Sequence, residues 1–378
     1  MNSKLPNTKT SIFAVMSQMA NQYGALNLSQ GFPDFPVSNK LIELVNKNML
    51  AGNNQYAPMP GVMELREVIS EKIEKIHGKF YNPDTEITVT AGATQALYST
   101  ITALVHEGDE VIVFEPVYDS YVPAIELSGG TPIFLQLKGD DYRIDFAELQ
   151  KVITAKTRMI IINSPHNPTG AVLSEDDIKK LEKIISGTKI ILLSDEVYEH
   201  IIFDKRKHYS FAGSQKLANQ SVIIGSFGKT FHTTGWKTGY CLAPKEIMNE
   251  IRKVHQFVVF CVNTPVQYAV AEYFKDDNNY LSVKEMYQEK RDYFIKLLKG
   301  SRFKITPAEG TYFQLLDFSN ITDMPDNEYA EFLIKEHKIA SIPVSAFYHD
   351  KHKSSVLRFC FAKGNETLEK AAEILNKI

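Results

Sequence analysis

The sequence predicts an α/β fold, with a mostly parallel sheet sandwiched by helices and a smaller α+β domain. Six short runs of β-branched and other apolar residues lie between residues 87 and 224 and alternate with helical patterns. Near-continuous apolar runs suit strands that are buried on both faces, as in a parallel sheet covered by helices. After about residue 290 the pattern changes to helix, short strands and helix, which indicates the smaller domain.

The expected elements follow in chain order. The large sheet would use strands at 87–90, 110–114, 132–135, 159–162, 189–193 and 221–224. Ser174 with Asp177 resembles a capping box and predicts a helix over 174–185. In the smaller domain we expect helices at 291–298, 328–336 and 366–378, and strands at 311–316 and 355–361. The domain boundaries would then be 1–40 for an N-terminal segment joining the small domain, 41–285 for the large domain and 286–378 for the small domain.

Composition excludes several classes of function. The 378 residues carry a formal net charge of −3, so no basic field is present that would hold a nucleic acid. The three cysteines are widely spaced and form no C-x-x-C pair, which indicates neither a disulfide framework nor a metal site. The start of the chain lacks the apolar region of a signal peptide, and the longest apolar run, 257–262, is far shorter than a membrane span. We therefore expect a cytoplasmic protein.

Lys229 is the first candidate for chemistry. Most lysines are solvated surface cations, but Lys229 follows a buried strand and stands beside Gly228. A partly desolvated lysine has a lowered pKa and can form a Schiff base with an aldehyde. Ser226 to Lys229 also matches S-x-x-K, and 237–239 matches K-T-G, as in serine β-lactamases. Those two motifs lie too close together for that fold, and no S-D-N occurs, so we reject acyl transfer.

Asp195 and Tyr198 follow the strand at 189–193. An aspartate there could simply cap the next helix. Together with a reactive lysine, a carboxylate could hold a protonated pyridine nitrogen, and a tyrosine could bond the ring oxygen of pyridoxal phosphate.

Other strand ends supply further groups for the same cofactor. Residues 91–96 lead from a strand into a helix and could bind its phosphate, with help from Ser226 and Lys237. Asn167 lies in a turn-rich loop and could reach the ring oxygen. Arg358 interrupts an apolar stretch and requires a partner, either a structural acid or a substrate carboxylate. No G-x-G-x-x-G follows any strand, which disfavours a dinucleotide.

These motifs resemble the class I/II pyridoxal-phosphate aminotransferases of fold type I over nearly the whole chain. The matching stretches, in order, are 27–34, 55–56, Gly61, 92–94, 167–170, 195–198, 226–230, 235–237 and Arg358. The resemblance implies a seven-stranded, mostly parallel sheet and a homodimer with shared active sites. It further implies that amino groups move from an amino acid to a 2-oxo acid in two half-reactions.

The resemblance also implies roles for single residues. Lys229 would bind the cofactor and move the substrate proton, while Arg358 and the backbone of Gly31 would bind the substrate carboxylate. The remaining cofactor contacts would come from Asp195, Tyr198, Asn167, Tyr118, Ala93, Thr94, Ser226, Lys237 and, from the neighbouring subunit, Tyr56. Many members have arginine where this chain has Lys237. The lysine keeps the positive charge but lacks the guanidinium that contacts a phosphate through two hydrogen bonds.

Within this family, residues 30–36, 236–237, 255–256 and 342–348 are similar to the kynurenine and glutamine transaminase group, and 165–168 to its methionine aminotransferase branch. The candidate side-chain pocket is aromatic and neutral, and consists of Phe13, Tyr23, Tyr118 and the neighbouring subunit's Phe260. It suits methionine, phenylalanine or tyrosine. Kynurenine aminotransferases tend to have tryptophan where Phe13 falls, whereas the single tryptophan of this chain is Trp236.

Two alternatives stay open beside the aminotransferase. One is a kynurenine transaminase that also acts as a lyase on cysteine S-conjugates, in which the same cofactor chemistry expels a β-substituent. The other is a non-enzymatic regulator built on this fold, which would need an added DNA-binding region, and no room for one exists before Ser29.

Overall fold

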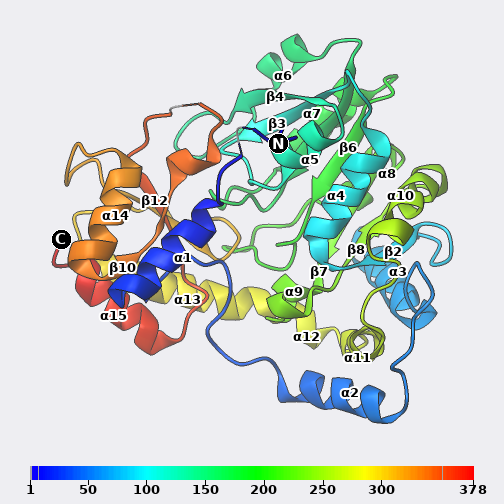
Figure 1. Ribbon diagram of the computed structural model, residues 1–378, viewed down its shortest axis with the longest axis horizontal. Coiled ribbons are helices and arrows are strands. Elements are labelled where there is room, and N and C mark those ends of the chain that lie inside the picture. Colours follow the sequence, from blue (N-terminus) through cyan, green and yellow to red (C-terminus); the bar gives the residue numbers. More distant parts are fainter. Residues whose placement is uncertain (1, 7, 351) are drawn as a thin grey trace.

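Seven strands form the central sheet of the computed structural model, which describes residues 2–6, 8–350 and 352–378 (Figure 1). Their order across the sheet is β2-β8-β7-β6-β5-β3-β4. Their bounds are Ile87–Thr90 (β2), Glu110–Glu115 (β3), Thr131–Gln136 (β4), Thr157–Asn163 (β5), Ile191–Asp195 (β6), Ser221–Ser226 (β7) and Gly239–Leu242 (β8). The mostly parallel seven-stranded sheet predicted from the sequence is confirmed, and all six expected strands are present.

The seventh strand, β8, has no counterpart among the six apolar runs, and only the family resemblance implied a seventh strand. It is antiparallel to both of its neighbours, β2 and β7. Its four residues follow directly on the loop that carries Lys237, and a glycine start with one polar aromatic residue gives no strand pattern. Strand β8 packs closely against β7 because position 225 is a glycine. A Cβ added at Gly225 would lie 2.2 Å from Cζ of Tyr240.

Helices cover both faces of the sheet (Figure 1). Successive residues of β3 point to opposite sides, so that Val111 and Val113 join one hydrophobic core while Ile112 joins the other. This double burial explains the uninterrupted apolar runs. The helices of the large unit are α2 (Asn39–Leu50), α3 (Met63–His77), α4 (Gly92–Leu104), α5 (Tyr121–Leu127), α6 (Phe146–Val152), α7 (Glu175–Ile185), α8 (Gln215–Ala218), α9 (Phe227–Thr230), α10 (Lys245–Val258), α11 (Thr264–Phe274) and α12 (Asn278–Leu281). The expected capping box of Ser174 and Asp177 is formed at the start of α7.

A smaller unit combines the two ends of the chain. Strand β1 (Leu26–Asn27) pairs in parallel with β10 (Ile339–Ala340), and β11 (Ile342–Pro343), β12 (Val356–Cys360) and β9 (Phe313–Asp317) form a three-stranded antiparallel sheet. Figure 1 shows the N-terminal helix α1 in blue beside the orange helix α14 of the C-terminal part. The helices here are α1 (Ile12–Tyr23), α13 (Val283–Leu297), α14 (Asp326–His337) and α15 (Asn365–Leu375). Across the described ranges, no helix combines the length and the apolar character needed to cross a membrane.

Candidate active site

A cavity lies at the carboxyl ends of β5 and β6, beside the start of α4. Ligands of open α/β sheets bind at this edge, where the strand ends expose polar groups. The cavity brings together seven residues proposed from the sequence, which are Ala93, Thr94, Tyr118, Asn167, Asp195, Tyr198 and Lys229. They come from five separate segments of the chain, which the fold brings together at one edge of the sheet.

Lys229 lies in the short helix α9, directly after β7. Ser226 caps this helix, because its Oγ accepts a hydrogen bond of 3.3 Å from the backbone N–H of Lys229. The Nζ atom of Lys229 donates to Oη of Tyr312 at 2.8 Å and to the carbonyl oxygen of Gly31 at 3.3 Å. Burial lowers the pKa of the Lys229 ammonium to about 8, so a neutral amine is available close to physiological pH.

Asp195 ends β6 and is only 3% exposed. Its Oδ2 accepts a hydrogen bond of 2.6 Å from Oη of Tyr121, and its Oδ1 accepts one of 3.3 Å from the backbone N–H of Val197. Burial raises the pKa of the Asp195 carboxyl to about 6, although the bond from Tyr121 opposes that rise. No described lysine, arginine or histidine forms an ion pair with Asp195, so its buried carboxylate is suited to a cation that arrives with a ligand.

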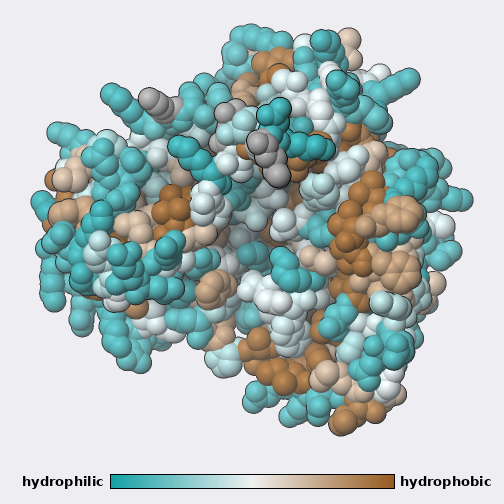
Figure 2. All heavy atoms as spheres, in the orientation of Figure 1, coloured by the Kyte–Doolittle hydropathy of each residue, from teal (hydrophilic) through white to brown (hydrophobic). Residues whose placement is uncertain are grey.

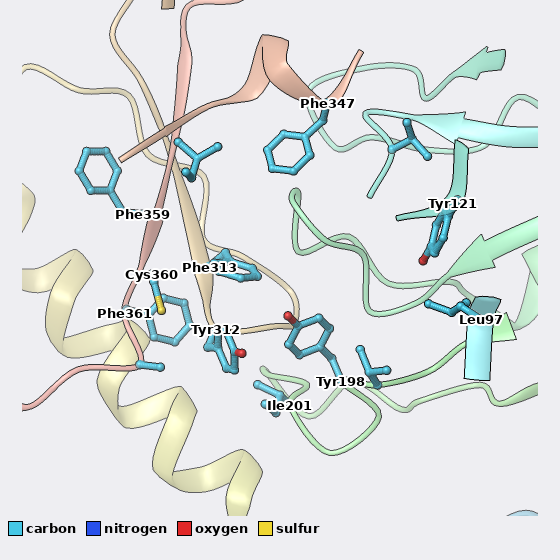
Figure 3. Close-up of a cluster of buried hydrophobic side chains, with 14 of the residues drawn as sticks. Leu97, Tyr121, Tyr198, Ile201, Tyr312, Phe313, Phe347, Phe359, Cys360 and Phe361 are labelled. Carbon is cyan, nitrogen blue, oxygen red and sulfur yellow. The ribbon is translucent and has the colours of Figure 1, made fainter. Parts of the chain in front are cut away.

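Aromatic side chains line the space between Lys229 and Asp195. The rings of Tyr198 and Tyr312 meet edge to face at 5.2 Å, and Figure 3 shows their hydroxyl groups on the sides that face each other. Nζ of Lys229 lies 5.5 Å from the centre of the Tyr198 ring. Burial raises the pKa of the Tyr118 hydroxyl to about 12, so this group stays a neutral hydrogen-bond donor.

The start of α4 offers a cradle for an anion. Gly92 begins the helix with φ +75°, and no side chain caps its first turn. A Cβ added at Gly92 would lie 3.3 Å from Nζ of Lys237, and one added at Gly239 would lie 3.1 Å from the backbone nitrogen of Ala93. A lysine ammonium and unpaired N–H groups at a helix N-terminus together bind phosphate.

Arg358 lies on β12, with 1% of its surface exposed. Its guanidinium donates to Oδ1 of Asn167 at 2.8 Å and to the carbonyl oxygen of Ser29 at 3.0 Å, and no acid of the described residues forms an ion pair with it. Three rings surround it, with their centres 5.1, 3.8 and 5.4 Å from Cζ, and these are Phe13, Phe313 and Phe347. Burial lowers the pKa of Arg358 to about 10. Since a buried charge requires a partner, this position fits a carboxylate supplied from outside.

Other residues proposed from the sequence lie elsewhere. Tyr23 is at the opposite end of α1 from Phe13, about 15 Å away by helix rise, and its ring faces Nζ of Lys338 at 5.3 Å. Of these two residues of α1, Phe13 is the one that contacts Arg358, and the place of Tyr23 in the side-chain pocket stays a prediction. Tyr56 and Phe260 contact each other edge to face at 5.4 Å and are 84% and 47% exposed, so neither belongs to the cavity of its own chain.

The structure adds residues that sequence reasoning missed, namely Tyr121, Tyr312, Phe313 and Phe347. Tyr121 is the first residue of α5, shortly after the end of β3. This position was the one sequence signal that could have indicated a site residue. Tyr312 and Phe313 lie at the start of β9, where they resemble ordinary core residues. Their contacts with Lys229 and Arg358 join segments far apart in the sequence.

Comparisons with known proteins agree with this geometry. A family model described as aminotransferase class I and II matches residues 23–375. The chain is 47% identical to the methionine aminotransferase of Escherichia coli, over 100% of this chain and 98% of that protein. It is 35% identical to a kynurenine–oxoglutarate transaminase of Dictyostelium discoideum, over 97% and 94% of the two chains.

Solved structures give the same result. A crystal structure from Escherichia coli, identified with a methionine aminotransferase function, superposes with a TM-score of 0.98 at 47% identity, over 100% of this chain and 99% of that chain. The N-succinyldiaminopimelate aminotransferase of Mycobacterium tuberculosis superposes with a TM-score of 0.96 at 34% identity, over 100% and 99%.

The donor groups of the cavity fit pyridoxal phosphate. The buried carboxylate of Asp195 suits a ring nitrogen, the amine of Lys229 suits an aldehyde, and the start of α4 with Lys237 suits a phosphate. Asp195, Lys229 and the start of α4 border one cavity, and the family model covers nearly the whole chain. The chain belongs to the class I and II aminotransferases, which are pyridoxal-phosphate enzymes.

Proposed function

We propose that this aminotransferase takes the amino group from methionine or from an amino acid with an aromatic side chain and transfers it to a 2-oxo acid. The observation that carries the proposal is the setting of Arg358, a buried guanidinium with no acidic partner among the described residues and with three phenylalanine rings around it. A carboxylate bound there leaves the rest of the amino acid among apolar rings.

Several residues would hold the cofactor. Asp195 would pair with the ring nitrogen, and Tyr198 and Asn167 would contact the ring oxygen, while Tyr118 would lie against the ring face. The phosphate would be bound by Ala93, Thr94, Ser226 and Lys237. Bound pyridoxal phosphate supplies an electron sink for negative charge that develops at the substrate α-carbon.

Lys229 would act as nucleophile and as proton carrier. Its lowered pKa means that part of the population is neutral amine near pH 8, and only the neutral form can attack a carbonyl or accept the α-proton. Tyr312 and the Gly31 carbonyl accept hydrogen bonds from Nζ and so hold this atom toward the cavity. The Gly31 backbone would also border the substrate carboxylate.

Substrate preference would come from the apolar rings near Arg358. Phe13 lies 5.9 Å from Phe347, and both contact the guanidinium, so the wall of the pocket carries no charge of its own. Such a wall favours apolar side chains over aspartate or glutamate by desolvation, and separates methionine from phenylalanine only by about 1–3 kcal/mol per methylene. The relatives named above support methionine first and kynurenine second.

The active enzyme would be a homodimer in the cytoplasm. Apolar residues are exposed on one side of the large unit, including Leu50 (81%), Tyr56 (84%) and Phe257 (87%). Figure 2 shows brown surface in the region where Figure 1 draws α2 and α10. Patches of this kind mark protein interfaces. Tyr56 and Phe260 would then reach the partner's cavity, and three free cysteines fit a reducing compartment.

A panel of twenty amino acids in the first half-reaction tests the proposal. The signal is the loss of the visible absorbance of the Lys229-bound cofactor. We expect methionine, phenylalanine and tyrosine to react fastest and aspartate and glutamate slowest. Aspartate as the best donor would refute it. Release of pyruvate and ammonia from a cysteine S-conjugate without any acceptor would instead favour the lyase. Sedimentation velocity tests the dimer.

A further inference from the structure

Glu115 is a carboxylate at the end of β3 that lies outside the cofactor cavity. It is fully buried (0% exposed), and no lysine or arginine of the described residues is paired with it. Its partner is His349, whose backbone N–H donates to Oε1 at 2.5 Å and whose Nδ1 lies 3.0 Å from each carboxylate oxygen. Because buried carboxylates are costly without donors, this pair fixes the position of His349 relative to the large sheet.

His349 ends a short segment that begins with the 3₁₀ helix η4 (Val344–Phe347) of the smaller unit. The start of the segment is bound to its own unit, because the backbone N–H of Ser345 donates to Oδ2 of Asp326 at 2.8 Å. The end is bound to the large unit through Glu115, and the His349 ring is stacked on Phe134 at 4.0 Å. The segment therefore bridges the two units.

Phe347 lies between these two attachment points. Its carbonyl oxygen accepts a hydrogen bond of 2.7 Å from the backbone N–H of Val117, two residues after Glu115. Its ring lies 5.4 Å from Cζ of Arg358 and 5.9 Å from the Phe13 ring. Figure 3 shows Phe347 pointing from η4 into the space that Phe313 and Tyr198 border from the other side.

We propose that Glu115 and His349 are positioning residues for substrate specificity. By fixing η4 they hold the Phe347 ring against Arg358, and this ring forms the wall that a large apolar side chain contacts. Small side chains do not reach the wall and do not depend on it. The inference rests on the proposed function, since it assigns Arg358 to the substrate carboxylate.

The test compares His349→Ala with His349→Asn in the holoenzyme, using methionine, phenylalanine and alanine as donors. For His349→Ala we expect KM for methionine and phenylalanine to rise roughly tenfold. A tenfold change corresponds to the free energy of about one charge-assisted hydrogen bond, here the one between the His349 ring and Glu115. The kcat values, KM for alanine and the visible absorbance of the bound cofactor should change little. Asparagine places an amide nitrogen where Nδ1 was and should restore most of the lost affinity.

His352→Ala is the matched control. It removes an imidazole from the same loop, one that stacks on Tyr348 at 3.7 Å and does not touch Glu115, and it should leave all three KM values unchanged. Because His349 is 46% exposed, its variants are expected to fold even where Glu115→Gln does not.

An equal loss with all three donors, or no loss with any, would overturn the inference. Failure of asparagine to restore what alanine removes would overturn it too. These results differ from failure of the proposed function, in which the unmodified enzyme itself would not use methionine.

Discussion

Replacement of Tyr121 by phenylalanine should change the binding of pyridoxal phosphate in a pH-dependent way. The hydroxyl donates to Oδ2 of Asp195 at 2.6 Å, and both residues are 3% exposed. A hydrogen bond to a charged group contributes about 1.5–3 kcal/mol. Since 1.36 kcal/mol corresponds to one pKa unit, its loss should raise the pKa of Asp195 by about one to two units. The carboxyl would then titrate near pH 7–8 instead of about 6.

The direction of the pH effect follows from which protonation state of Asp195 binds the cofactor. In the proposed arrangement the ionised carboxylate would pair with a protonated ring nitrogen, so binding should weaken as pH falls through the pKa of Asp195. Because the variant has the higher pKa, its affinity should decline at a higher pH than that of the unmodified enzyme. The ratio of the two dissociation constants should rise from near one at about pH 9 to about ten or more at about pH 5.5.

Titration of the apoenzyme with pyridoxal phosphate at several pH values measures this ratio. Taking the ratio removes the titration of the cofactor itself, which is common to both proteins. Tyr329→Phe is the control, because Tyr329 is equally buried and its hydroxyl has no partner among the described residues. A ratio for Tyr121→Phe that stays constant across the pH range would refute the assignment of Asp195 to the ring nitrogen.

Three further predictions concern the same site. Lys229→Ala should abolish both turnover and the visible absorbance of the lysine-bound cofactor, and a spectrum like that of the unmodified enzyme would contradict its role. Arg358→Ala should lower kcat/KM by about a hundredfold or more for all α-amino acids alike, as measured in the half-reaction, whereas a loss confined to one donor would place Arg358 in the side-chain pocket. Gly239→Ala puts a Cβ 2.8 Å from the Gly225 carbonyl oxygen, so we expect about 1–3 kcal/mol lower stability in urea and weaker cofactor binding; unchanged values would show that β8 can shift.

A strand was predictable from the sequence where both of its faces are buried, because its residues are then apolar at every position. The run at 159–162 is apolar at every position because β5 is covered on both faces, and β5 was found with its ends displaced by one or two residues. By contrast, β8 is short, begins with glycine and is antiparallel, and only its neighbours β2 and β7 make it a strand.

By itself the sequence determined the α/β class, the family and the reactive groups at the strand ends, because those residues carry their chemistry and stand in fixed order along the chain. Tertiary structure alone decided how these groups are tuned. The hydrogen bond from Tyr121 to Asp195 joins residues 74 positions apart, and the contact of Tyr312 with Lys229 joins residues 83 positions apart. The rings around Arg358 likewise come from three separate segments of the chain. Such contacts leave no periodic pattern in the sequence, yet burial at these positions sets the proton affinity of each group.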